Sequence, residues 1–271
     1  AQFKIQTWAV DAGRHMLEEM TQKTPDYLPA RLALAQIAAN DKKYDEADAQ
    51  IAKVLAKDAA HPEALLLRAN IRLAKGENDL AVKQLENMLQ LYPQSSQVLY
   101  ELGTAYLTIG DVKKATTSLT QAITLTPNYA DAIVLLASIN VRIGDPSTAI
   151  AALKQLLPQR PDLAQAWLLL ANAYRAQGNA GDAIAVYGQM EKLFPGNPQT
   201  SWLLGQAYVQ QNKKTEARQA FTHALELAPD YLPAVEQLVT LDLADKQYPA
   251  AHERVAAQIA KDPKQAGPYL L

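Results

Sequence analysis

Apolar residues recur with helical spacing along the chain, in paired stripes separated by a short polar turn. The stretch 96–129 illustrates the pattern. Its first stripe, at the i, i+3, i+4, i+7 spacing of one helix face, consists of Leu99, Leu102, Gly103, Tyr106 and Leu107. Gly110-Asp111 follows as a turn, and the second stripe consists of Ala115, Leu119, Ala122 and Ile123. Pro127 closes the stretch because proline cannot continue the helix before it. The pattern predicts two amphipathic helices joined by a turn.

The same unit recurs every 34 residues. Prolines mark the period at Pro93, Pro127, Pro161, Pro195, Pro229 and Pro263, and Pro25 fits the same register. Ala59 stands where one proline would be expected. The predicted turn recurs at Gly76, Gly110, Gly144 and Gly178. A fixed period of this length predicts a stack of helix–turn–helix repeats.

Small residues recur in the same register, which indicates where two helices approach closely. One column lies twelve residues before each proline position and reads Gly13, Ala47, Ala81, Ala115, Ala149, Ala183, Ala217 and Ala251. A second column reads Ala35, Ala69, Gly103, Ala137, Ala171, Gly205 and Val239. A leucine precedes most members of the second column, whereas Arg68 interrupts that leucine series.

These residues resemble the tetratricopeptide repeat (TPR), whose pattern is W-x2-L-G-x2-Y, then A-x3-F, then P. Residues 164–197 match it with Trp167, Leu170, Ala171, Tyr174, Ala183, Tyr187 and Pro195. Residues 198–231 match it with Leu204, Gly205, Tyr208, Ala217, Phe221 and Pro229. The resemblance covers nearly the whole chain. It implies an all-α fold, a right-handed α-solenoid of 34-residue helix–turn–helix units.

We expect residues 1–271 to form a single solenoid. Its complete repeats would be 28–61, 62–95, 96–129, 130–163, 164–197, 198–231 and 232–265. A partial repeat would occupy 1–27, and a further repeat would begin at 266–271. Solenoids usually end in a capping element with a polar outer face. We expect the chain to be a piece of a longer array, because neither end shows such an element.

The resemblance also implies that positions 2, 5, 9, 12 and 13 of each repeat face a concave groove. Position 9 is polar and uncharged throughout, with Gln36, Asn70, Thr104, Ser138, Asn172, Gln206 and Thr240. In the family, an asparagine here often bonds the backbone of an extended peptide, and an amide offers both donors and an acceptor. We expect this column to hold a peptide. The alternative is that these residues are solvated positions tolerated in a helix.

Position 5 is apolar or aromatic in six consecutive repeats, with Leu32, Leu66, Tyr100, Val134, Leu168 and Trp202. Exposed, this column would be an interaction surface; alternatively, it packs against the adjoining helices. No lysine occupies position 5, which argues against the carboxylate clamp of chaperone-binding relatives. Arg142 and Arg175 in adjacent repeats would form a basic spot for a carboxylate, or else be solvated or locally paired.

Composition excludes several classes of function. Lys and Arg number 26 and Asp and Glu 28, so the net charge of −2 gives no footprint for nucleic acid. No cysteine is present, which excludes thiolate chemistry and disulfides. The four histidines lack a metal-ligand spacing. No apolar run reaches the roughly 18 residues of a membrane span. We expect no enzyme activity, no metal and no cofactor.

The sequence therefore predicts a non-catalytic scaffold that binds an extended peptide or a partner helix in its groove. The alternative is a structural assembly module that acts by stacking through open ends or through its convex surface. The style of the repeats is similar to bacterial envelope arrays linked to exopolysaccharide secretion or exosortase-dependent sorting. This similarity favours the periplasm or envelope over a cytoplasmic adaptor.

Overall fold

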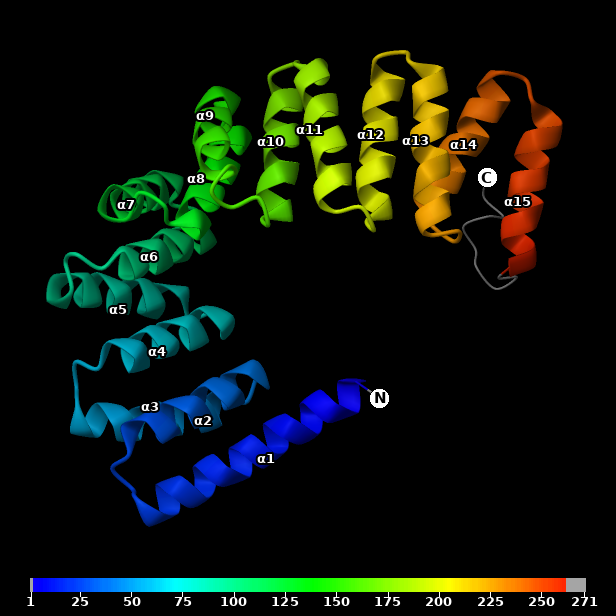
Figure 1. Ribbon diagram of the computed structural model, residues 1–271. Helices are drawn as coiled ribbons and strands as arrows, with labels where there is room; N and C mark the ends of the chain where they lie inside the picture. The colour runs from blue at the N-terminus through cyan, green and yellow to red at the C-terminus, as the bar shows by residue number, and fades with distance from the viewer. Residues whose placement is uncertain (1, 262–271) are drawn as a thin grey trace. The chain divides into compact units, whose positions relative to one another are not determined.

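The computed structural model describes residues 2–261, in which fifteen α-helices and no β-strand occur (Figure 1). Helix α1 is Gln2–Lys23. The first helices of the seven pairs have 13 residues each and are α2 (Leu28–Asn40), α4 (Pro62–Ala74), α6 (Ser96–Thr108), α8 (Ala130–Arg142), α10 (Ala164–Ala176), α12 (Pro198–Gln210) and α14 (Leu232–Ala244). The second helices are α3 (Tyr44–Lys57), α5 (Asn78–Leu91), α7 (Val112–Leu125), α9 (Pro146–Leu156), α11 (Ala180–Leu193), α13 (Lys214–Leu227) and α15 (Tyr248–Lys261). The repeat expected to begin at 266–271 lies outside the described residues.

The chain divides into two compact units, residues 1–132 and 133–271. In the first unit, α2, α4 and α6 each pack on the second helix that follows them. Contacts between α2 and α4 and between α4 and α6 also bring these three first helices together. In the second unit, each helix from α9 to α14 packs on the next in chain order.

Each helix pair turns through one residue with a left-handed backbone. These residues lie 34 apart and are Lys42, Gly76, Gly110, Gly144, Gly178, Asn212 and Lys246, with φ between 56° and 88°. The amide that follows donates back into the last turn of the helix, as Asp111 N–H does to the Tyr106 carbonyl at 2.9 Å. This is the Schellman type of helix end, which glycine adopts without steric cost. The four predicted glycine turns are confirmed, and three repeats make the same turn with a side chain present.

The two columns of small residues form the contact between helices. Apart from Gly13, the first column is buried, and its six alanines from Ala47 to Ala217 are fully inaccessible. The second column is buried in every repeat from Ala35 to Val239. Gly13 is half-buried, and a side chain there would meet nothing within 4 Å. Helix α1 is accordingly continuous over its 22 residues and lacks the turn that the later helix pairs make.

The missing proline at Ala59 does not change where its helix ends. Helix α3 stops at Lys57, and the Asp58 carboxylate accepts a hydrogen bond from the Ala60 amide at 3.1 Å. An aspartate that bonds the backbone two residues on forms an Asx-turn. The turn chemistry of Asp58 thus replaces the proline at this position.

Candidate functional site

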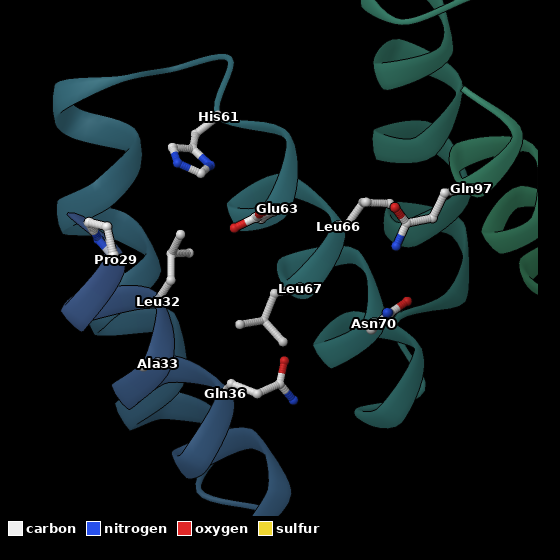
Figure 2. Close-up of a pocket in the computed structure, with 10 residues that line it drawn as sticks. All are labelled: Pro29, Leu32, Ala33, Gln36, His61, Glu63, Leu66, Leu67, Asn70 and Gln97. Atoms are coloured by element: carbon white, nitrogen blue, oxygen red, sulfur yellow. The ribbon is translucent and has the colours of Figure 1, made fainter. Parts of the chain in front are cut away.

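The first helices of the first unit enclose a hollow of about 570 Å³. Its apolar wall comes from Leu32 on α2 and from Leu66 and Leu67 on α4. In Figure 2, Leu32 and Leu67 lie between Gln36 at one end and His61 and Glu63 at the other. Three side-chain amides share the lining and come from successive first helices: Gln36, Asn70 and Gln97. The structure therefore brings together Gln36, Leu66 and Asn70, three residues selected from the sequence.

The amides of this hollow are accessible to a ligand. Gln36, Asn70 and Gln97 are all exposed. The Gln36 amide bonds Asn40 one turn further along α2, at 3.0 Å, which leaves its other donor and its acceptor open to a ligand. The hollow can accept an apolar side chain against the leucines while its amides pair with a peptide backbone.

A second group of side chains adjoins the hollow through Asn70, whose amide donates a hydrogen bond to the Glu101 carboxylate. Burial raises the pKa of Glu101, and the hydrogen bond from Asn70 opposes part of that rise. The rings of Tyr100 and Tyr129 lie 5.3 Å apart between centroids, tilted by 51°. Burial, followed by the charges of Glu101 and Asp131, raises the pKa of Tyr129 to about 12. We call Tyr100, Glu101, Tyr129 and Asp131 the tyrosine–carboxylate cluster.

The second unit has a polar hollow of about 620 Å³ between α10, α11 and α12. Asn172 and Arg175, both selected from the sequence, line it beside Gln210. Arg142 is also exposed, but it does not take part in this hollow. The sequence predicts a basic spot made by Arg142 and Arg175, whereas in this hollow Arg175 lies with the amides of Asn172 and Gln210.

The remaining position-9 residues differ in how their polar groups are used. Thr104 donates its hydroxyl to the Tyr100 carbonyl at 3.1 Å, and Ser138 donates to the Leu135 carbonyl at 2.8 Å. Both hydroxyls thus bond their own helix and keep only acceptor capacity. Gln206 is half-buried. Exposed side-chain amides, which offer both a donor and an acceptor, are therefore found at Gln36, Asn70 and Asn172.

The position-5 column contributes to the core as well as to the surface. Leu66 is 8% exposed and belongs to the core of the first unit. Val134 and Leu168 are half-buried and pack against the core of the second unit. Trp202 packs against α13 and α14, and its indole N–H donates to the Pro233 carbonyl at 3.2 Å. Within this column, Tyr100 belongs to the tyrosine–carboxylate cluster.

Two further features were not anticipated from the sequence. An apolar hollow of about 400 Å³ lies in the second unit, lined by Pro158 in the turn after α9, Trp167 on α10 and Leu193 on α11. The only signal for it was the family motif, which assigns Trp167 to packing. A buried carboxylate, Asp242, is held by Arg218 and Arg254. This ion cluster joins α13, α14 and α15 and is structural.

The described residues offer little for metal or membrane chemistry. No group of three or more histidine, aspartate or glutamate side chains in residues 2–261 could hold a metal ion. None of the helices in this range is long and apolar enough to cross a bilayer.

Comparison with protein families gives a consistent result along the chain. A tetratricopeptide repeat model matches residues 66–130, 100–164, 134–198 and 168–231. A second tetratricopeptide repeat model matches residues 9–71. No curated protein matches the chain.

Solved structures share the fold over most of the chain. A crystal structure of MamA is 28% identical, with a TM-score of 0.54 over 59% of this chain and 93% of MamA. The C-terminal part of a TPR protein from Cytophaga hutchinsonii is 18% identical, with a TM-score of 0.71 over 88% of this chain and 98% of that one. YrrB, described as a TPR protein with an unusual peptide-binding site, is 16% identical, with a TM-score of 0.56 over 69% and 96%. These similarities do not support the expected link to exopolysaccharide secretion.

Proposed function

Since the chain belongs to the tetratricopeptide repeat family, we propose that it is a scaffold that holds an extended peptide of a protein partner along its first helices. Tetratricopeptide repeats are generally protein–protein interaction modules and typically carry no catalysis. The proposal names the face that binds and the kind of ligand.

One observation supports this face above others: the hollow that joins exposed amides from three successive first helices to a wall of leucines. A peptide backbone carries one donor and one acceptor per residue, and each must be paired when water is excluded. The amides of Gln36 and Asn70 supply both kinds of group. Burial of a leucine-sized ligand side chain against Leu32 and Leu67 would add apolar stabilisation, about 25 cal/mol per Å² removed from water.

We extend the same role to the second unit, where Asn172 lines a hollow with Arg175. Gln206 would continue the amide series there, while Thr104 and Ser138 would act as acceptors. Val134, Leu168 and Trp202, the partly buried residues of position 5, would hold the first helices in place by packing against the core. Arg142 would act only at the edge of this surface.

Selection of linear peptides tests the proposal. A random library of twelve-residue peptides on phage would be selected against the whole chain, and the recovered peptides measured by fluorescence anisotropy. A Gln36→Ala, Asn70→Ala variant should lose affinity by about tenfold or more, because each lost hydrogen bond contributes roughly 0.5–1.5 kcal/mol. A matched variant, Asn87→Ala with Gln90→Ala, removes two exposed amides from α5 and should bind as the wild type does. Equal affinity for all three proteins would refute peptide binding at this face.

A second candidate function is self-assembly, and the apolar hollow around Trp167 favours it. Apolar surface of this kind is often an association site. Sedimentation velocity from micromolar to near-millimolar protein would detect it as a rise in mass, reduced by Trp167→Ala. A constant monomer mass over that range would exclude this function.

A further inference from the structure

We propose that the first unit selects a basic peptide: an extended segment in which a lysine or arginine accompanies an apolar side chain. This inference rests on the proposed function and deepens it, because it names the chemistry of the peptide. The apolar side chain would enter the leucine-walled hollow, and the basic side chain would meet the tyrosine–carboxylate cluster.

Two of the three cations on the first helices of this unit bond side chains on the second helices. Helices α2, α4 and α6 together carry these three: Arg31, Arg68 and Arg72. Arg31 donates to Gln50 on α3 at 3.2 Å, and Arg72 donates to Gln84 on α5 at 2.6 Å. Arg68 is half-buried, and burial followed by the neighbouring charge of Arg72 lowers its pKa, a shift that the charge of Asp48 on α3 opposes. The guanidinium groups of Arg31 and Arg72 are thus directed to the second helices.

The carboxylates, by contrast, remain on the first-helix side. Glu63 lines the hollow. Glu101 is half-buried, and the one polar contact found for it within residues 2–261 is the neutral amide of Asn70. Asp131 is exposed, and its charge acts on both tyrosine hydroxyls. Neither Glu101 nor Asp131 forms an ion pair within residues 2–261. Glu63 likewise has no ion pair among the described residues, so this face carries three carboxylates that no ion pair in that part of the chain neutralises.

The two tyrosines make the site specific for a cation rather than only acidic. An ammonium or guanidinium group is attracted to the face of a tyrosine ring, and the attraction increases when water is excluded. A carboxylate beside such rings adds a charge-assisted hydrogen bond. Tyr100 and Tyr129, tilted at 51° to one another, present ring surface beside Glu101. A basic side chain satisfies both features, whereas an acidic one would be repelled by both.

Asn70 connects the two halves of the site, since it lines the hollow and also bonds Glu101. In an extended peptide, side chains two residues apart point the same way, about 6.5–7 Å from one another. A peptide bonded to Asn70 would therefore place an apolar residue on one side and a basic residue two positions away on the other.

The peptides selected against the whole chain test this inference. Lysine or arginine should be enriched two positions from an apolar residue. A Glu101→Gln, Asp131→Asn variant should bind these peptides about tenfold more weakly or worse, and Tyr129→Leu should also weaken them. Acetylation of the peptide lysine should cause a similar loss with wild-type protein, a readout that needs no protein variant.

Asp79→Asn is the matched control. Asp79 is exposed in the first turn of α5, as Asp131 is in the first turn of α8, and its carboxylate has no hydrogen bond or ion pair with the described part of the chain. This variant should bind within about twofold of wild type. Thermal melts should show that all variants fold.

The outcomes separate the two proposals. Selected peptides without basic residues that still depend on Gln36 and Asn70 would overturn the basic selectivity and keep peptide binding. Basic peptides whose affinity is unchanged by Glu101→Gln, Asp131→Asn would overturn this inference as well. A library that yields no binder, or only binders indifferent to Gln36→Ala, Asn70→Ala, would overturn both.

Discussion

Gly205 on α12 lies directly against the ring of Phe221 on α13. A Cβ atom at position 205 would stand 2.5 Å from Phe221 Cε1 and 2.6 Å from Cδ1. Phe221 is fully buried, so its ring has no free space to move into. In this repeat, a glycine on the first helix therefore leaves the space that the large Phe221 ring on the second helix occupies.

We predict that Gly205→Ala lowers the free energy of unfolding by about 1–3 kcal/mol, because the added methyl group overpacks the contact with Phe221. Gly188→Ala is the comparison, since a Cβ there meets nothing within 4 Å. That variant should gain up to about 1 kcal/mol from helix propensity. Urea unfolding measures both, and a Gly205→Ala midpoint at or above that of wild type would contradict the contact.

The left-handed turns predict stabilising substitutions. Lys42 and Lys246 hold φ values of 61° and 59°. A left-handed conformation costs a residue with a Cβ roughly 1–2 kcal/mol. Lys42→Gly and Lys246→Gly should therefore each raise stability by up to about 1 kcal/mol, after the larger chain entropy of glycine is subtracted.

Gly110→Ala is the reverse experiment. Gly110 has a φ of 80°, and a Cβ there meets no neighbour within 4 Å. Any loss of stability would thus come from the backbone, and we expect about 1 kcal/mol. Equal melting temperatures for Gly110→Ala and wild type would show that this turn tolerates a side chain.

Replacing Glu101 by a neutral side chain should raise the stability of the fold, by an amount that depends on pH. Burial raises its pKa in the folded chain above the unfolded value of about 4.3. Folding is therefore most favourable below that value, and stability is lost as pH rises through the folded pKa. Glu101→Gln should be more stable than wild type at pH 7, and the difference should vanish below about pH 4. Melts from pH 3 to pH 8 check this, and a deficit at pH 7 would contradict it.

Asp245 predicts the opposite dependence. Lys214 donates to its carboxylate at 2.6 Å and Arg218 at 2.9 Å, and these hydrogen bonds lower the pKa of Asp245. The stabilisation that Asp245 contributes is fully present above its unfolded pKa of about 3.9. It is lost as the pH falls through the lower pKa of the folded chain. Asp245→Asn should melt below wild type at pH 6, and the two curves should converge toward pH 2. Parallel curves across the whole range would exclude this role.

Much of the fold followed from the sequence because it depends on local spacing. The 34-residue period placed the helix pairs, and the columns of small residues identified the buried contacts from Ala35 and Ala47 onward. The positions of proline and glycine located most of the turns, since each of these residues sets the backbone conformation at its own position. The exposed amides Gln36, Asn70 and Asn172 were found from the repeat register together with the family resemblance, which implies that position 9 faces the groove.

The sequence by itself thus determined the repeat, the pairing of its helices and the amide series on the first helices. Only the tertiary structure decided which of those positions share a hollow, and that Tyr100 meets Tyr129 beside a carboxylate, Glu101, for which residues 2–261 supply no ion pair. It also decided that Arg31 and Arg72 turn to the second helices. Helical periodicity is a property of one stretch of chain, so composition and spacing reveal it. The charge of a surface depends instead on which long side chains find partners across the helix contacts, and those partners are set by packing in three dimensions.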